Sequence, residues 1–70
     1  MDIKEKLQTL SKQLNLNDYE IAERIGVSPS AVCRWINGSR EPSASNLIML
    51  SLKFPNFFNK DEVMKWLSKK

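Results

Sequence analysis

The chain has 70 residues, 41% of them hydrophobic and 27% charged, which is typical of one small globular domain spanning residues 1–70. Eleven basic against eight acidic residues give a net charge of +3, which favours an anionic partner such as nucleic acid. The absence of histidine and the single cysteine, Cys33, exclude an internal disulfide and most catalytic or metal-ligand sets.

Apolar spacing predicts five helices and no strand, over about residues 2–14, 18–25, 29–37, 43–54 and 59–68. The apolar residues of the first helix are 4, 3 and 4 residues apart, so they form one stripe along the helix: Ile3, Leu7, Leu10 and Leu14. Asp2 is a suitable N-cap for this helix, and Glu5, three residues later, is its expected partner in a capping box.

The second helix has a clear start and a clear end. Asn17 precedes it as an N-cap with Glu20 as the box partner, and Gly26 ends it. Only three residues, 26–28, separate it from the next helix, which is the spacing of a helix-turn-helix unit. The sequence therefore predicts such a unit at about residues 18–37.

The third helix carries the residues that point to a function. Ser28 is its N-cap and Pro29 fills the first helical position. With Val32 and Trp35 facing the core, the outer face consists of Pro29, Ser30, Cys33, Arg34 and Asn37. Residues 26–40 contain two arginines and no carboxylate, a composition that favours entry into a phosphate-lined groove.

The last two helices are predicted to build the core and an interface. The helix at 43–54 is apolar nearly all round, so we expect it to be the central helix. Large apolar residues gather in and before the last helix: Phe57, Phe58, Met64, Trp66 and Leu67. Part of this cluster covers the core, and the excess at about 60–68 is expected to form a dimer contact. The solvated basic end of this helix is formed by Lys65, Lys69 and Lys70.

Two stretches of the sequence resemble a known family. Residues 17–28 (NDYEIAERIGVS) and 31–43 (AVCRWINGSREPS) are similar to the Cro/C1-type, or Xre-like, helix-turn-helix proteins, among them lambdoid phage Cro and repressor N-terminal domains. The resemblance covers about residues 3–54 and implies an all-α, compact five-helix domain with the lambda repressor-like DNA-binding fold. Two positions depart from the family pattern: Asp18, where glutamine is common, and Ile36, where glutamate often stands.

The resemblance also implies roles for individual residues. Recognition-helix positions at base edges and neighbouring phosphates are Ser28, Pro29, Ser30 and Arg34, with Cys33 beside them. Positions that usually hold the DNA backbone, at the end of this helix and in the loop after it, are Asn37, Ser39, Arg40 and Ser43. These residues together are the DNA-binding site that we expect.

Most of these residues also have a simpler interpretation. Arg34 can pair with guanine O6 and N7, or it can contact a phosphate or stay solvated. Arg40 can hold a phosphate or enter the minor groove, or it can be an idle surface charge. Pro29 can touch a thymine methyl group or only shape the helix start. Asn37 can bond a phosphate or end the helix, and Cys33 can be a redox switch or a small residue tolerated near a groove.

Several classes of function are excluded on the same evidence. We expect no enzyme activity, no cofactor and no metal, because the sequence has no histidine base, glycine-rich phosphate loop or cysteine–histidine cluster. A small domain without disulfides is typical of the reducing cytoplasm. The longest apolar run, at 47–50, is far shorter than the roughly 18 residues that span a bilayer, so no membrane partner is expected.

The sequence thus predicts a regulator that binds specific double-stranded DNA, a Cro-like repressor that occludes a palindromic operator as a homodimer. We expect it at the nucleoid, in the cytoplasm of a bacterium or of a phage-infected cell. The dimer can be one that forms only when two copies are bound to the DNA. The alternative is an antitoxin-like or co-activator module that binds protein with the same helical fold, which the apolar C-terminal segment favours.

Overall fold

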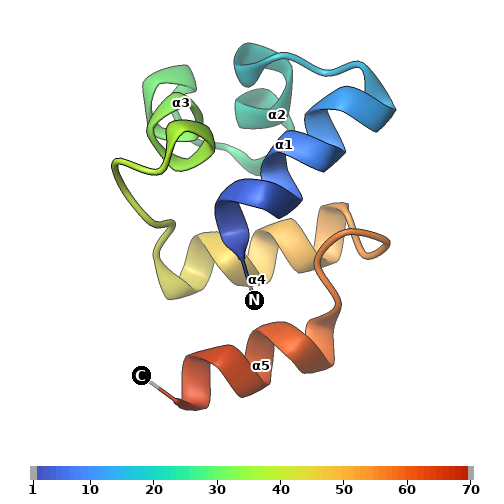
Figure 1. Cartoon of the computed structure of the whole chain (residues 1–70), viewed down its shortest axis with the longest axis vertical. Coiled ribbons are helices and arrows are strands. Elements are labelled where there is room, and N and C mark those ends of the chain that lie inside the picture. Colours follow the sequence, from blue (N-terminus) through green and yellow to red (C-terminus); the bar gives the residue numbers. More distant parts are fainter. Residues whose placement is uncertain (1, 70) are drawn as a thin grey trace.

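The computed structural model describes residues 2–69 and contains five helices and no strand within them (Figure 1). Their bounds are α1 (Ile3–Leu14), α2 (Asp18–Ile25), α3 (Pro29–Asn37), α4 (Ala44–Lys53) and α5 (Lys60–Ser68). The predicted all-α fold is confirmed, and the helix bounds agree with the predicted ones to within a residue. Lys70, expected at the solvated helix end, lies outside the described residues. No helix in the described part of the chain is long and apolar enough to cross a membrane.

Polar side chains fix the start of every helix. The N-cap residues that accept a hydrogen bond from a first-turn N–H are Asp2, Asn17, Ser28, Ser43 and Asn59. At α2 the capping box is complete: Asn17 Oδ1 accepts from the Glu20 N–H at 2.8 Å, and Glu20 Oε1 accepts from the Asn17 N–H at 3.1 Å. The box predicted at α1 is half formed, since within residues 2–69 Asp2 bonds to the Glu5 N–H without a return bond.

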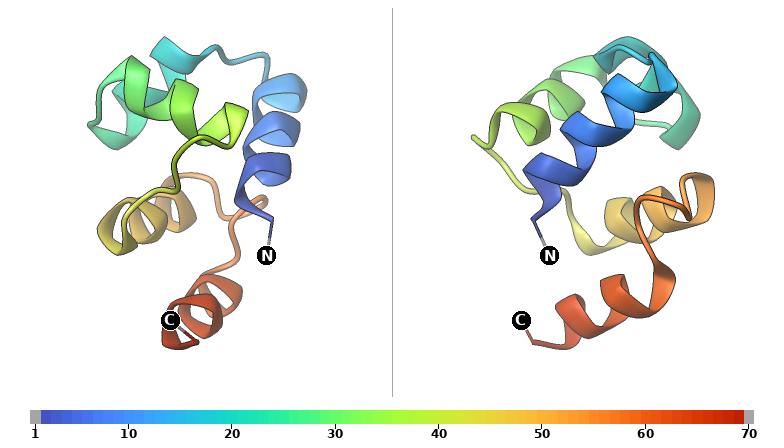
Figure 2. Two further views of the ribbon diagram at one scale, coloured as in Figure 1. Left: turned by 60° about the vertical axis from the view of Figure 1, so that its left-hand side comes forward. Right: turned by 45° about the vertical axis from the view of Figure 1, so that its right-hand side comes forward.

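One hydrophobic core joins all five helices. Its fully buried side chains are Leu7, Leu10, Ile21, Val32, Leu47, Leu50, Phe58 and Val63. Figure 1 and Figure 2 show α1, α2 and α3 grouped on one side of α4, with α5 packed on the other side. The most extensive contact between two helices is that of α2 with α3. The core therefore holds α3 in a fixed direction, with one face turned away from the molecule.

One prediction about the core is wrong. Leu14 does not extend the buried stripe of α1, because it is 44% exposed where the chain turns away through the left-handed residue Asn15. The helix α4 is central as expected, between the group of α1, α2 and α3 and α5, but one flank is open, since Leu52 is 62% exposed and Ile48 is exposed as well. Contacts from α2 and α5 cover only part of α4, which leaves these two apolar side chains on an open flank.

Candidate nucleic-acid interface

The connection between α2 and α3 is short because a glycine reverses the chain. Gly26 has a φ of +76°, a left-handed conformation that a side chain disfavours. The N–H groups of Gly26 and Val27 both donate to Ala22 O, at 2.8 and 3.1 Å, which ends α2. Ala22 is buried, and its small side chain lets α3 approach α2 closely. A helix-turn-helix arrangement is therefore present at residues 18–37.

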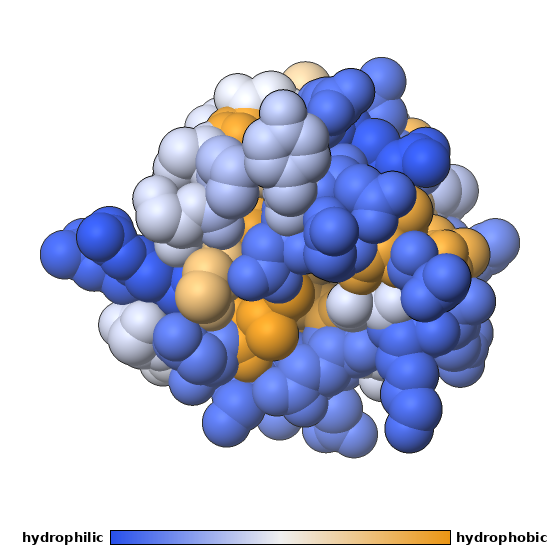
Figure 3. Space-filling model, turned by 90° about the horizontal axis from the view of Figure 1, so that it is seen from above, coloured by the Kyte–Doolittle hydropathy of each residue, from blue (hydrophilic) through white to orange (hydrophobic). Residues whose placement is uncertain are grey.

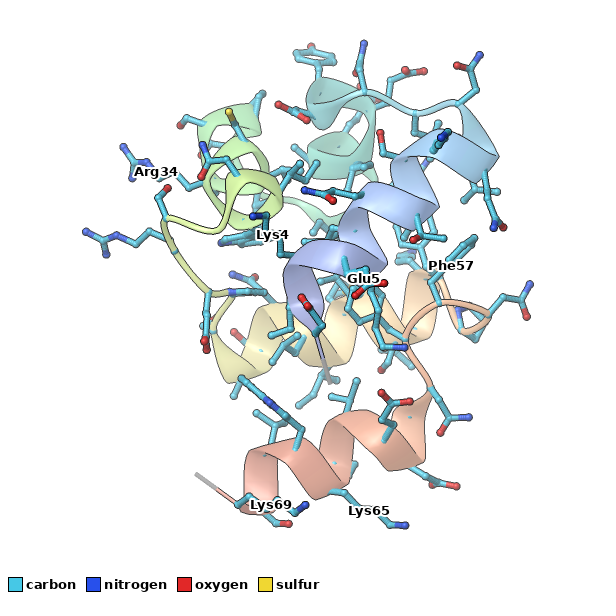
Figure 4. The ribbon with its side chains drawn as sticks, in the orientation of Figure 1. Lys4, Glu5, Arg34, Phe57, Lys65 and Lys69 are labelled. Carbon is cyan, nitrogen blue, oxygen red and sulfur yellow. The ribbon has the colours of Figure 1, made fainter. Side chains whose placement is uncertain are left out.

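The inner and outer faces of α3 divide as predicted. Val32 and Trp35 are buried and attach the helix to the core, while solvent reaches Pro29, Ser30, Cys33, Arg34 and Asn37. From above, a patch of pale, weakly polar side chains lies on the side of α3, with blue hydrophilic groups around it (Figure 3). The Arg34 side chain points away from the body of the molecule (Figure 4). This helix thus presents a row of side chains that another molecule can reach.

The charge of the helix-turn-helix unit differs from that of the whole chain. Residues 18–37 contain three carboxylates, all in α2, and two arginines, which gives a net charge of −1 against +3 for the chain. The only charged residue of α3 is Arg34. Attraction for a polyanion therefore comes from α3, from the loop after it and from the rest of the chain, and not from α2.

A compact turn follows α3 around Gly38. Arg34 O accepts hydrogen bonds from the backbone N–H groups of Ser39 at 3.0 Å and of Arg40 at 3.3 Å. Asn37 Oδ1 accepts from the Ser39 N–H at 3.0 Å and from Ser39 Oγ at 2.7 Å. The amide oxygen of Asn37 thus shapes the turn. Its NH₂ group has no partner within residues 2–69 and remains available as a donor.

The other predicted site residues lie at helix starts or on the open surface. Ser28 and Ser43 cap α3 and α4, where their Oγ atoms accept from first-turn N–H groups at 3.3 and 3.4 Å. Ser30 Oγ lies 3.3 Å from Ser28 Oγ, and Cys33 is an exposed free thiol. All the predicted site residues are exposed, and they lie together on α3 and on the loop that leads to α4.

Two residues of α1 reach the same region and are not predicted from the sequence. Gln8 Nε2 donates to Ile36 O at 3.1 Å, across 28 residues of sequence. One turn earlier, the Lys4 side chain crosses the turn after α3, where a Cβ atom at Gly38 would lie 3.1 Å from Lys4 Cδ. Helical spacing places Lys4 and Gln8 on one face of α1, but it does not tell which element that face meets.

Comparison with protein families agrees with this geometry. Residues 3–55 match a family model described as helix-turn-helix. The chain belongs to the Cro/C1-type helix-turn-helix family. This helix-turn-helix family consists of DNA-binding transcription regulators, so the chain is a DNA-binding regulator by class. No curated protein and no solved structure matches the chain.

The two departures of this helix-turn-helix protein from its family pattern have local explanations. Ile36 packs against the core instead of carrying a charge, and Gln8 holds its carbonyl group. Asp18 lies in the first turn of α2, where the helix dipole stabilises a carboxylate. A carboxylate cannot donate to a phosphate, so the Asp18 side chain lacks the donor that a glutamine would offer there.

Proposed function

We propose that this helix-turn-helix protein binds a specific double-stranded DNA sequence and acts as a Cro-like repressor by occluding it. The observation that carries the proposal is the outer face of α3, which is exposed, free of carboxylates and fixed from behind by Val32 and Trp35. The major groove of B-DNA is about 12 Å wide and admits an α-helix with its side chains. Other proteins cannot bind a DNA sequence that is occupied in this way.

The outer face of α3 has a centre of small side chains. Successive helical residues are about 100° apart, so the middle of the face holds Cys33, Asn37 and Ser30. Pro29 and Arg34 lie at its two edges. Short side chains in the middle allow the helix to come close to the base edges, where Ser30 can donate or accept. Arg34, at the edge beside the following loop, has the length to reach guanine O6 and N7.

Contacts to the DNA backbone are assigned to the turn after α3 and to the start of α4. The amide NH₂ group of Asn37 and the guanidinium of Arg40 are donors that suit phosphate oxygens. The hydroxyl of Ser39 donates to Asn37 Oδ1 at 2.7 Å, so its part is to orient that amide group. Ser28 and Ser43 are exposed N-caps, and helix N-termini favour phosphate.

The role of Arg34 can be tested with one substitution. We expect Arg34→Ala to weaken binding to a selected duplex roughly ten- to a hundredfold, because a bidentate arginine–guanine pair is worth about 1–3 kcal/mol. The matched control is Arg24→Ala, which removes the other arginine of the helix-turn-helix unit, exposed at the end of α2. Mobility-shift titrations measure both variants. Equal affinity of Arg34→Ala and wild type would show that Arg34 does not contact the bases.

A palindromic operator requires two copies of the chain, with recognition helices about 34 Å apart. In the predicted C-terminal cluster, Phe58 is fully buried. Three other members of the cluster are half-buried: Phe57, Trp66 and Leu67. Met64 is 52% exposed on α5. Because an exposed apolar side chain favours contact with a partner, we propose that Met64 and α5 form the contact between two copies on the DNA.

Sedimentation velocity with a palindromic duplex tests this contact. Met64→Glu is expected to bind as a single copy with the fold intact, because the side chain lies on the surface. The control is Leu14→Glu, which places the same charge at an exposed apolar position of α1 and should still bind as two copies. A wild-type complex with one copy per palindrome would exclude the dimer.

A second candidate function is an antitoxin-like or co-activator module that binds another protein. The exposed apolar residues Ile48 and Leu52 on α4 favour it, since they offer a surface that the DNA contact does not use. A test of binding to protein and to duplex DNA distinguishes the two functions. A stoichiometric protein partner, recovered by a chain that binds no duplex, supports the module, and salt-dependent binding of duplex DNA supports the regulator.

A further inference from the structure

We infer that Lys4, in the first turn of α1, is an additional phosphate-contacting residue of the DNA interface. It would act beside Arg40 and the amide group of Asn37, at the turn that follows α3. The inference rests on the proposed function, because it assigns a phosphate of the bound duplex to this residue. The sequence gives no reason to single out Lys4 among the lysines of the chain, and its position in the fold supplies that reason.

The Lys4 side chain is held against the turn. A Cβ atom placed on Gly38 would lie 3.1 Å from Lys4 Cδ, 3.7 Å from Cε and 3.8 Å from Nζ. The aliphatic part of Lys4 therefore crosses the glycine, and the ammonium group lies next to the chain segment that leads to Arg40. In Figure 4, Lys4 lies near the end of α3, whereas Lys65 on α5 and Lys69 just after it lie at the far end of the molecule.

A hydrogen bond fixes α1 in this place. Gln8 lies one helical turn after Lys4 and donates from Nε2 to Ile36 O at 3.1 Å. Two residues on the same face of α1 thus contact the last turn of α3 and the turn beyond it. The place of the Lys4 backbone beside the end of α3 is therefore set by the fold, and its side chain starts from that place.

The charge around Lys4 suits a phosphate. Lys4 is exposed and makes no ion pair within residues 2–69, whereas Lys6 pairs with Glu62 at 3.5 Å. Lys4 and Arg40 line one open cleft, which also contains Asp2 and Glu41.

Both carboxylates of that cleft already have an interaction within the protein. Asp2 accepts from the Glu5 N–H at 3.0 Å, and Glu41 has an interaction of its own. On the side of the turn, two donor groups have no partner within residues 2–69: the ammonium of Lys4 and the amide group of Asn37. Together with the guanidinium of Arg40, these make three donor groups at that side, and donors of this kind match the oxygens of a DNA phosphate.

A purely structural role is the competing explanation for Lys4. The C-terminus of α3 carries a partial negative charge, and a nearby ammonium group stabilises it. That role predicts a change in stability without a change in the number of counterions released on DNA binding. The dependence of affinity on salt distinguishes the two roles, because each neutralised phosphate contributes about 0.9 to the slope of log affinity against log salt.

The experiment compares Lys4→Gln with Lys12→Gln in the whole chain, each bound to a selected duplex at several salt concentrations. Lys12 is the matched control, an exposed lysine in the last turn of the same helix. We expect Lys4→Gln to lower the magnitude of the slope by about 0.9, so that its affinity deficit shrinks roughly threefold between 50 and 200 mM salt. Lys12→Gln keeps the wild-type slope, and Lys4→Arg restores it.

The outcomes that overturn the inference are distinct from those that overturn the proposed function. A wild-type slope for Lys4→Gln, with or without a loss of stability in urea, assigns Lys4 a structural role and ends the inference while leaving DNA binding intact. A wild-type chain that binds no duplex at any salt concentration ends the proposed function, and the inference with it. An equal fall in slope for Lys12→Gln also overturns it, because it shows a general effect of charge.

Discussion

Gly26 and Gly38 end the two helices of the helix-turn-helix unit with the same backbone conformation but different surroundings. Their φ angles are +76° and +84°, values that cost a residue with a side chain about 1–2 kcal/mol. A Cβ atom at Gly26 would meet open space, whereas at Gly38 it would press on the stem of Lys4. The two positions therefore separate the cost of backbone strain from the effect of moving one side chain.

Alanine substitution at each glycine tests this difference. Urea denaturation should show Gly26→Ala and Gly38→Ala destabilised by similar amounts, about 1–2 kcal/mol, because the stem of Lys4 is flexible and can yield. Only Gly38→Ala should also weaken DNA binding, since it displaces the Lys4 ammonium. The finding of equal DNA affinity for the two variants at the same folded fraction would be evidence against that displacement.

Single residues also show where prediction from sequence succeeds and where it fails. Val32 and Trp35 are predicted to face inward and do so, because the spacing of apolar residues on α3 fixes which side is buried. Leu14 is predicted to belong to the apolar stripe of α1 and is exposed, because apolar spacing does not tell whether a neighbouring element reaches that flank. Lys4 is missed for the same reason: its surroundings come from a contact between distant segments.

At the scale of elements, the ends of the helices are the best-predicted feature. Each helix begins at a polar residue whose side chain bonds to a first-turn N–H, so the sequence alone marks the start. Which helices pack against each other, in contrast, cannot be predicted from the sequence in this way. Nothing in the sequence of α1 indicates that Gln8 bonds to the carbonyl of Ile36, although this bond fixes α1 on the last turn of α3.

The complete capping box of α2 gives a prediction for that element. Asn17→Ala removes the acceptor of the Glu20 N–H and is expected to lower the free energy of unfolding by about 1 kcal/mol. Asn17→Asp keeps an oxygen in the same position and is the control, with stability close to wild type. Thermal and urea denaturation measure both. Unchanged stability of Asn17→Ala would mean that packing of α2 on α3, and not the cap, holds the start of the helix.

At the scale of the whole molecule, the two aromatic residues before α5 contribute unequally to the core. Phe58 is fully buried in the core, and its neighbour Phe57 is half-buried. Removing a buried phenylalanine costs about 3–5 kcal/mol, against a total of about 5–15 kcal/mol for a domain. We expect Phe58→Ala to be largely unfolded or close to it, and Phe57→Ala to remain folded. Circular dichroism during urea denaturation checks the order, and a Phe57→Ala variant that is less stable than Phe58→Ala would reverse it.

Selection from a random pool of duplex DNA is the most direct measurement of the proposed activity. The chain should enrich one palindromic consensus whose half-sites are centred about 34 Å apart, with a guanine in each half-site as the partner of Arg34. Enrichment of that guanine should disappear with Arg34→Ala and persist with Arg24→Ala. A pool that stays random after repeated rounds at low salt would show that the exposed face of α3 does not read DNA.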